Sequence, residues 1–281
     1  MRTRSHRLRV LVNRTASVVA GVSALSGVFV MAWILYDIAI RGAAALSWSF
    51  FTKLPTPPGV AGGGVANAIV GTLLITALAS VVAIPLGLGA GIYLAEFGRD
   101  SRAATAVRFF ANLLMGTPSI IIGVFVYTLI VVPTHTFSGY AGALALAVIM
   151  LPVMARTAED MLNLVPNELR ESALALGAPK WRVTLNIIFR AARTGLLTGA
   201  LLAVARVSGE TAPLLFTALN SPFWMHSLGE PTANLTVTIF NYSMSPYNDW
   251  QRTAWAASFL IVAGVLVLNV AARGVLKERK R

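Results

Sequence analysis

Long apolar runs alternate with short basic segments along the whole chain. Neither Thr15 to Tyr36 nor Phe109 to Ala155 contains an Asp, Glu, Lys or Arg. A helix needs about 20 mainly apolar residues to cross the hydrocarbon core of a bilayer. The pattern therefore predicts an all-α membrane protein with six transmembrane helices: Thr15–Ile40, Asn67–Glu96, Arg108–Val132, Gly139–Arg156, Arg193–Leu219 and Thr253–Arg273.

The flanks of these spans differ sharply in charge. Nineteen of the 23 lysines and arginines lie in the N-terminal flank, the connections after the second and fourth spans, and the C-terminal flank. The other flanks contain only Arg41, Lys53 and Arg252, and Arg206 lies inside the fifth span. Because cytoplasmic flanks carry an excess of Lys and Arg, we predict that both termini are cytoplasmic, which requires an even number of spans.

The composition excludes an ordinary soluble domain. Hydrophobic residues make up 56% of the 281 residues and charged residues only 12%, whereas soluble domains carry about a quarter charged residues. The formal net charge of +12 does not predict nucleic acid binding, because the basic residues lie in the gaps between apolar runs. Membrane lipid is the expected surrounding. The chain has no cysteine, so a thiolate metal site is excluded, and we predict no metal site or cofactor.

The connection at 157–190 is too polar to span a membrane. Pro166 lies where a helix would begin, with Glu168 and Glu171 in its first turns, as the helix dipole favours. Gly177 ends that helix, and a second helix follows the turn. Three apolar residues share one helical face: Leu169, Ala173 and Leu176. An ordinary connecting loop is the alternative interpretation.

Spacing within this connection resembles that of the binding-protein-dependent ABC importer permeases. Glu171, Ala173, Gly177 and Ile187 fit the pattern Glu-Ala-Ala, three residues, Gly, nine residues, Ile, although Ser172 departs from it. The resemblance implies that the turn docks into a groove on a separate ATPase. The residues that it assigns to this ATPase-coupling loop are Glu171, Ala173, Gly177, Ala178 and Pro179.

Further stretches resemble the A-type permease subunit of the high-affinity phosphate importer. They lie at 57–68, 91–99, 117–127, 164–181, 205–219 and 233–246. The resemblance implies the MetI-like fold of type I ABC importer permeases and the uptake of inorganic phosphate across a bacterial cell membrane. It also implies four partners: a second, C-type permease, two ATP-binding subunits and an extracytoplasmic phosphate-binding protein.

The chain is expected to divide into three parts. Residues 1–66 hold the cytoplasmic tail, the first transmembrane helix and an extracytoplasmic loop, 67–275 form the permease domain with the coupling loop, and 276–281 form a second tail. A further extracytoplasmic loop, 220–252, carries several Trp and Tyr residues. Such residues suit a membrane–water interface, so we interpret them as anchors, with a docking surface for an external partner as the alternative.

Two ionisable residues lie inside the predicted fifth span. Arg206 and Glu210 are four residues apart, a spacing that would place them on one helical face, able to pair. Charges at membrane depth are costly and point to function. Arginine can bond phosphate oxygens bidentately, so we predict that Arg206 faces the substrate path and that Glu210 offsets its charge. A purely structural ion pair is the alternative, and Pro213 is expected to open the helix nearby.

Other polar groups near the predicted path are weaker candidates. Thr211 follows Glu210, and Thr117 and Ser119 flank Pro118 in the third span. These hydroxyls would line the path, although those of Thr117 and Ser119 could equally bond the backbone of their own helix. Two carboxylates at span ends, Asp37 and Glu96, are interpreted as interfacial.

The chain is predicted to be a permease subunit rather than an enzyme. It contains no GxxxxGK[ST] phosphate loop, so ATP would be hydrolysed on another chain. A permease for another oxyanion, molybdate or sulfate, is the main alternative. A membrane-embedded enzyme would need a cluster of polar catalytic groups at one cavity, and in the sequence only Arg206 and Glu210 qualify.

Overall fold

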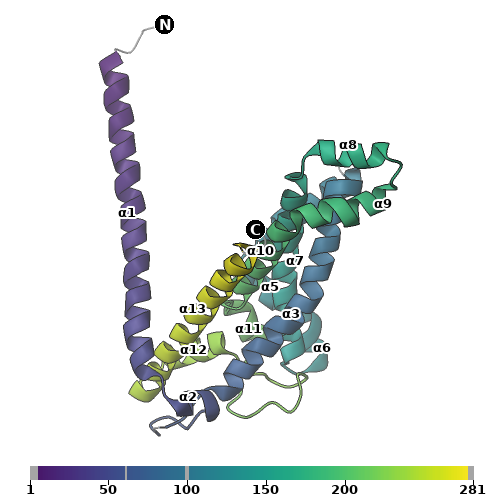
Figure 1. The fold of residues 1–281 in the computed structure, drawn as a ribbon. Coiled ribbons are helices and arrows are strands. Elements are labelled where there is room, and N and C mark those ends of the chain that lie inside the picture. Colours follow the sequence, from purple (N-terminus) through teal and green to yellow (C-terminus); the bar gives the residue numbers. More distant parts are fainter. Residues whose placement is uncertain (1–5, 61, 99–100, 278–281) are drawn as a thin grey trace.

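The computed structural model describes residues 6–60, 62–98 and 101–277 (Figure 1). Arg2, Arg4, Arg99 and residues 278–281 of the expected C-terminal tail lie outside this part of the chain. All regular elements of the described residues are helical, and short π-helical turns are labelled η. In chain order they are α1 (His6–Ala45), α2 (Trp48–Thr52), α3 (Ala66–Ile92), η1 (Tyr93–Phe97), α4 (Arg102–Gly116), α5 (Ser119–Val126), η2 (Tyr127–Val131), α6 (Val132–Thr134), α7 (Gly139–Asn163), α8 (Asn167–Ala175), α9 (Lys180–Val183), η3 (Thr184–Ile188), α10 (Phe189–Val207), α11 (Ala212–Thr217), α12 (Leu235–Ser243) and α13 (Asn248–Lys277).

Five described segments are long and apolar enough to cross a membrane, and the count rises to six if one bent pair of helices forms a single span. This all-α architecture confirms the predicted fold class. The fourth predicted span is longer than expected, because α7 continues past Arg156 to Asn163. The fifth begins earlier than expected, because α9, η3 and α10 form one continuous segment from Lys180 to Val207.

The third predicted span, Arg108–Val132, is wrong as a single helix. Segments Arg102–Gly116 and Ser119–Thr134 meet at an angle of 103°. Thr117 and Pro118 both have extended backbone between them, with ψ of 132°. The residue before a proline is driven away from helical geometry, and this explains why α4 ends at Gly116, directly before Thr117.

The fifth predicted span, Arg193–Leu219, is also broken. Helix α10 ends at Val207, and α11 begins only at Ala212, so residues 208–211 are not helical. Pro213 lies in the first turn of α11, where proline is well tolerated because its missing N–H has no helical partner. The helix is therefore interrupted just before Pro213, as expected, and the proline itself lies at the start of the next helix.

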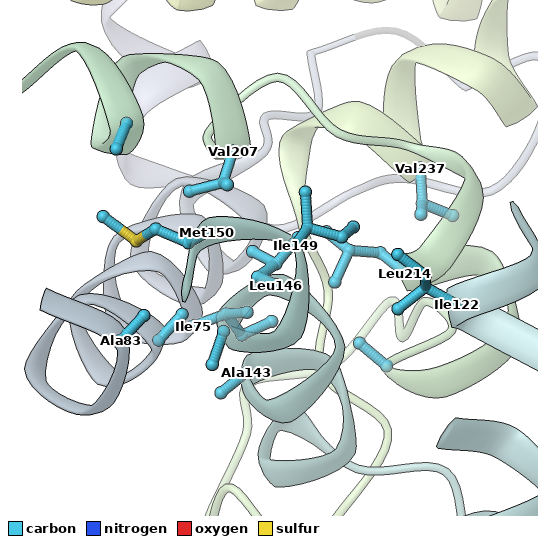
Figure 2. Close-up of a cluster of buried hydrophobic side chains, with 14 residues drawn as sticks. Ile75, Ala83, Ile122, Ala143, Leu146, Ile149, Met150, Val207, Leu214 and Val237 are labelled. Carbon is cyan, nitrogen blue, oxygen red and sulfur yellow. The ribbon is translucent and has the colours of Figure 1, made fainter. Parts of the chain in front are cut away.

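Helix α7 is the centre of the bundle and packs along α3 (Figure 2). Ile75 of α3 and Leu146 and Met150 of α7 are fully buried in the largest apolar cluster. The two backbones can approach closely at Gly87 because glycine has no side chain. A Cβ at this position would lie only 2.7 Å from the Cβ of Met154. Small residues at such contacts are typical of membrane helices.

Helix α1 stands away from the bundle and contacts α13 (Figure 1). Its large apolar side chains, including Leu25, Phe29 and Trp33, are exposed. Near the last turns of α1, the Arg41 guanidinium lies 5.0 Å from the ring centre of Trp255 on α13. The apolar surface of α1 is suited to lipid or to another membrane helix.

Candidate functional site

The two broken helices meet at a small cavity of about 110 Å³. Four of the five residues predicted to line the substrate path contribute to its wall, and Thr211 is the exception. The four come from distant parts of the sequence. The lining residues are Leu114, Met115, Thr117, Ser119, Ile122, Ile149, Val153, Arg206 and Glu210. Helix α5 packs on α11 so closely that a Cβ at Gly123 would lie 2.6 Å from the Cα of Pro213.

Arg206 and Glu210 share this cavity but do not form the predicted ion pair. Arg206 lies in the last turn of α10, whereas Glu210 follows the end of that helix. The i,i+4 rule applies only within a continuous helix, so the break at 208–211 separates the two side chains. Arg206 is exposed and Glu210 is partly buried. Arg206 lies at the C-terminus of α10, where the helix dipole favours a positive charge.

The broken segment is held by the start of α12. The hydroxyl of Thr236 donates to the backbone oxygen of Glu210 at 2.9 Å. Asn234, which is fully buried, has its Oδ1 3.0 Å from the Thr236 hydroxyl, whose one hydrogen this oxygen and the Glu210 oxygen share. Asn234 also accepts from the backbone N–H of Val237 at 3.0 Å and donates to the carbonyl of Leu219 at 3.1 Å. These fixed partners explain how non-helical backbone persists beside the cavity. Neither residue was predicted to belong to the site, although Asn before a helix is a recognisable capping signal.

The two hydroxyls at the other break differ in their availability. Thr117 donates to the carbonyl of Leu113 at 2.8 Å, so its hydrogen is used by its own helix, as the alternative interpretation expected. Ser119 has no side-chain hydrogen bond within the described residues, and it lines the same cavity. Ser119 is therefore the hydroxyl that can donate to a bound anion without losing an existing bond.

The connection between α7 and α10 has the predicted helix, turn and second helix. Helix α8 begins directly after Pro166, and Gly177 has a φ of +79° in the turn before α9. Of the predicted apolar face only Ala173 is buried, at 7% exposed, whereas Leu169 and Leu176 are exposed, the latter at 88%. The two leucines therefore do not pack inward.

The outer surface of this connection combines apolar and charged groups. Glu171 is exposed and forms no ion pair within the described residues. Leu174, Leu176 and Trp181 are exposed near it. Several exposed large apolar side chains within one short connection are typical of a surface that another protein covers.

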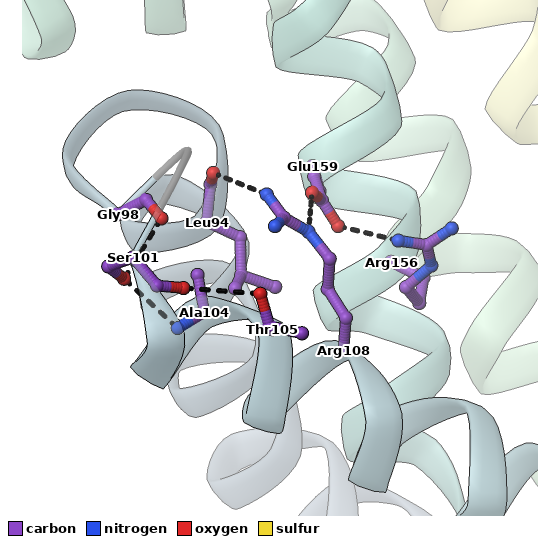
Figure 3. Close-up of polar contacts among 8 residues, drawn as sticks. All are labelled: Leu94, Gly98, Ser101, Ala104, Thr105, Arg108, Arg156 and Glu159. Atoms are coloured by element: carbon purple, nitrogen blue, oxygen red, sulfur yellow. Dashed lines mark hydrogen bonds and ion pairs between the residues drawn. The ribbon is translucent and has the colours of Figure 1, made fainter.

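A network of ion pairs that the sequence analysis did not predict lies at the same end of the bundle (Figure 3). The buried carboxylate of Glu159 accepts from Arg108 Nε at 2.7 Å and from Arg156 Nη1 at 2.8 Å. Arg108 also donates to the carbonyl of Leu94 at 3.1 Å. The i,i+3 spacing of Arg156 and Glu159 was a visible signal, but nothing in the sequence indicated that Arg108 would join them.

Glu96 lies at the end of its span, as expected, but it is buried in a second ion pair, which the interpretation as a simple interfacial charge did not include. Its side chain is only 5% exposed and accepts from Arg170 of α8 at 2.9 Å. The pairing was not visible because the two residues lie far apart in the sequence. Asp37, in contrast, pairs with Arg41 on its own helix, and both side chains are exposed.

The chain matches known proteins over most of its length. The family model for the binding-protein-dependent transport system inner membrane component matches residues 87–278. The chain is 49% identical to the phosphate transport system permease protein PstA of Yersinia pestis, over 95% of this chain and 91% of that protein. It is 48% identical to the PstA of Haemophilus influenzae, over 92% of each chain.

Solved structures show the same fold at low sequence identity. The inward-facing MetNI methionine ABC transporter aligns with a TM-score of 0.63 and 20% identity, over 76% of this chain and 95% of that one. A bacterial ABC transporter that imports the polysaccharide alginate aligns with a TM-score of 0.69 and 14% identity, over 98% of this chain and 100% of that one. With this fold and these close sequence relatives, the chain belongs to the family of PstA phosphate transport system permease proteins, within the binding-protein-dependent inner membrane transport components.

Proposed function

We propose that the chain is the permease subunit of an ATP-driven importer that moves inorganic phosphate into the cytoplasm. The observation that carries the proposal is the 49% identity, over 95% of the chain, to a protein named as a phosphate transport permease. The cavity between the broken helices supports it, because a guanidinium that stays charged lies there beside a hydroxyl and a carboxylate. The chain itself would not hydrolyse ATP.

Within this proposal Arg206 is the group that attracts the anion. Its guanidinium has paired N–H donors that match two phosphate oxygens. Glu210 lines the same cavity without pairing to Arg206 in this structure, so it lowers the net charge of the cavity while leaving the donors free. A path must bind its substrate weakly enough to release it, and a nearby carboxylate serves that need. Ser119 adds one neutral donor.

The energy would enter through the exposed connection between α7 and α10. One of the two ATP-binding subunits would dock on Glu171 and on the turn formed by Gly177, Ala178 and Pro179, and the other would dock on the second permease. Their closure would move this connection, and the helices would then rock around the cavity to open it alternately to each side. Exposed apolar groups at this connection fit a surface that a partner covers.

The orientation that this requires places α8 and both termini in the cytoplasm. The start of α1 and helix α8 lie toward the same end of the molecule (Figure 1), which agrees with the basic flanks of the sequence. At the opposite end, a groove of about 730 Å³ is lined by both predicted extracytoplasmic loops, including Pro57, Phe223 and Trp250. The phosphate-binding protein would release its ligand at this face, and a C-type permease would complete the pore.

The direct test is reconstitution in lipid vesicles with the second permease, the ATP-binding subunits and the phosphate-binding protein. We expect phosphate to stimulate ATP hydrolysis and labelled phosphate to accumulate. Molybdate and sulfate, each supplied with the same partners, form the comparison. Stimulation by either of these anions in place of phosphate would assign the alternative substrate, and ATP hydrolysis indifferent to all three would contradict the proposal.

A further inference from the structure

The π-helical turn η1 is bonded by two arginines from different helices. Arg170 of α8 bonds the carboxylate of Glu96, and Arg108 of α4 bonds the carbonyl of Leu94. Both Glu96 and Leu94 lie within η1. The turn therefore lies between the exposed α7–α10 connection and the helix that leads to the cavity.

Arg170 makes an unusually complete set of contacts. Its guanidinium donates to Glu96 through Nε at 3.1 Å and through Nη2 at 2.9 Å. Nη2 also donates to the carbonyl of Leu162 at 2.6 Å, and Nη1 donates to the carbonyl of Val165 and to Asn167. Leu162 lies in the last turn of α7, where carbonyls lack helical partners. One side chain thus joins α8, the end of α7 and η1.

Burial makes this junction rigid. The Arg170 side chain is 11% exposed and that of Glu96 is 5% exposed. Separating a buried, hydrogen-bonded ion pair would leave uncompensated charges in a poorly solvated place. Helix α9 also contacts η1. The ammonium of Lys180, the first residue of α9, lies 5.3 Å from the ring centre of Phe97 in η1. Displacement of α8 and α9 would therefore carry η1 with it.

The next step leads from η1 to the cavity. Arg108 bonds both Leu94 and the buried Glu159 of α7, at 3.1 and 2.7 Å (Figure 3). Its helix, α4, ends at the 103° bend, and Leu114, Met115 and Thr117 at that end line the cavity with Arg206. A continuous series of contacts therefore connects the exposed connection with the cavity wall.

We infer that Arg170 and Arg108 are positioning residues, which transmit movement of the α8–α9 connection through η1 to α4 and so to the bend beside the cavity. The inference rests on the proposed function, because it assumes that an ATPase moves the connection. It goes further in naming the contacts through which ATP hydrolysis would change the shape of the cavity.

The first test uses the complete reconstituted importer, after the unaltered complex has shown phosphate-dependent ATP hydrolysis. Glu96→Gln removes the carboxylate charge at nearly constant side-chain size, and Arg170→Lys keeps the positive charge but removes the paired guanidinium donors, so each weakens the junction. We expect ATPase co-purification to be unchanged and phosphate moved per ATP hydrolysed to fall about threefold to thirtyfold. The double variant should be no worse than the more affected single variant, because both remove one interaction. Arg108→Lys should act in the same direction.

The control is Asp37→Asn, which removes the exposed ion pair within α1 and should leave the ratio unchanged. A purely structural role would lower the yield of assembled complex but leave the ratio of phosphate to ATP normal in the complexes that form. That result would overturn the inference. Failure of the unaltered complex to respond to phosphate would instead contradict the proposed function, so the two failures are distinguishable.

A second measurement follows the movement itself. The chain has no cysteine, so cysteines introduced at exposed positions take spin labels selectively. Labels at Asn112 on α4 and Leu266 on α13 report movement of α4, and labels at Ser172 on α8 and Leu266 report movement of the connection. We expect ATP to change both distances in the unaltered complex and only the Ser172 distance in Glu96→Gln. An Asn112 distance that still changes in Glu96→Gln would overturn the inference.

Discussion

Arg206 shows how one residue can be identified correctly and its partner incorrectly. A charged group in an apolar span indicated function on energetic grounds alone, and the structure places it at a cavity. Its pairing with Glu210 was inferred from helical spacing, and the break at 208–211 removed the basis of that inference. A local rule such as i,i+4 pairing applies only where the helix that it assumes is continuous.

Arg206→Gln is expected to reduce phosphate uptake by about tenfold or more, because hydrogen bonds to charged groups contribute about 1.5–3 kcal/mol each. Assembly with the partner subunits should be spared, since Arg206 is exposed and forms no ion pair with Glu210. Uptake of labelled phosphate by reconstituted complexes is the measurement. Arg193→Gln, an exposed position on the same helix and outside the cavity, is the matched control. Equal uptake in both variants would return Arg206 to a structural role.

Gly177 is the residue whose backbone conformation most restricts substitution. Its φ of +79° costs a residue with a side chain about 1–3 kcal/mol, although a Cβ at this position would meet no heavy atom within 4 Å. We expect Gly177→Asp to abolish ATPase co-purification while membrane insertion stays normal, through backbone strain and a charge at the docking surface. Gly177→Asn, which accepts this φ about as well as Asp does but adds no charge, should retain more binding. Normal co-purification with full uptake would argue against the docking role.

At the scale of elements, the sequence located the breaks only approximately. Pro118 and Pro213 were visible, but proline can kink, end or begin a helix. Packing decided between these outcomes: α5 and α11 lie against each other, with Gly123 beside Pro213, which is possible only if both spans are interrupted. The start of α8 at Pro166 and its termination at Gly177 were predicted well, because the capping and turn preferences of these two residues act locally.

The ion pairs of η1 belong to the same scale and could not be predicted. Glu96 and Arg170 come from elements that meet only after α3 has packed along α7 and the α7–α10 connection has folded back. Either residue alone, near the end of an apolar run, is indistinguishable from an ordinary interfacial charge. The tertiary contact converts them into a junction between two elements.

At the scale of the whole molecule, the orientation in the membrane remains a prediction. Because the chain has no cysteine, single cysteines at Ser172 on α8 and Thr52 on α2 can be labelled with a membrane-impermeant maleimide. We expect Thr52→Cys to react in intact spheroplasts and Ser172→Cys to react only after the membrane is opened, because the basic flanks place α8 inside. Labelling of Ser172→Cys from outside would reverse the topology.

The exposed apolar surfaces suggest that this chain is one part of a larger assembly. Helix α1 leaves most of its side chains uncovered, and the α7–α10 connection exposes Leu176 and Trp181. The first surface is suited to lipid or a neighbouring membrane helix, and the second to a protein outside the bilayer. Both agree with a permease that works with other subunits.

The sequence by itself determined the apolar spans, the basic flanks and the family, because span length, charge and residue spacing are local properties that the chain carries before it folds. The tertiary structure alone decided where two spans break, that Arg206 and Glu210 face one cavity without pairing, and that Arg108 and Arg170 both bond η1. Each of these depends on contacts between residues far apart in the chain, and only packing brings such residues together.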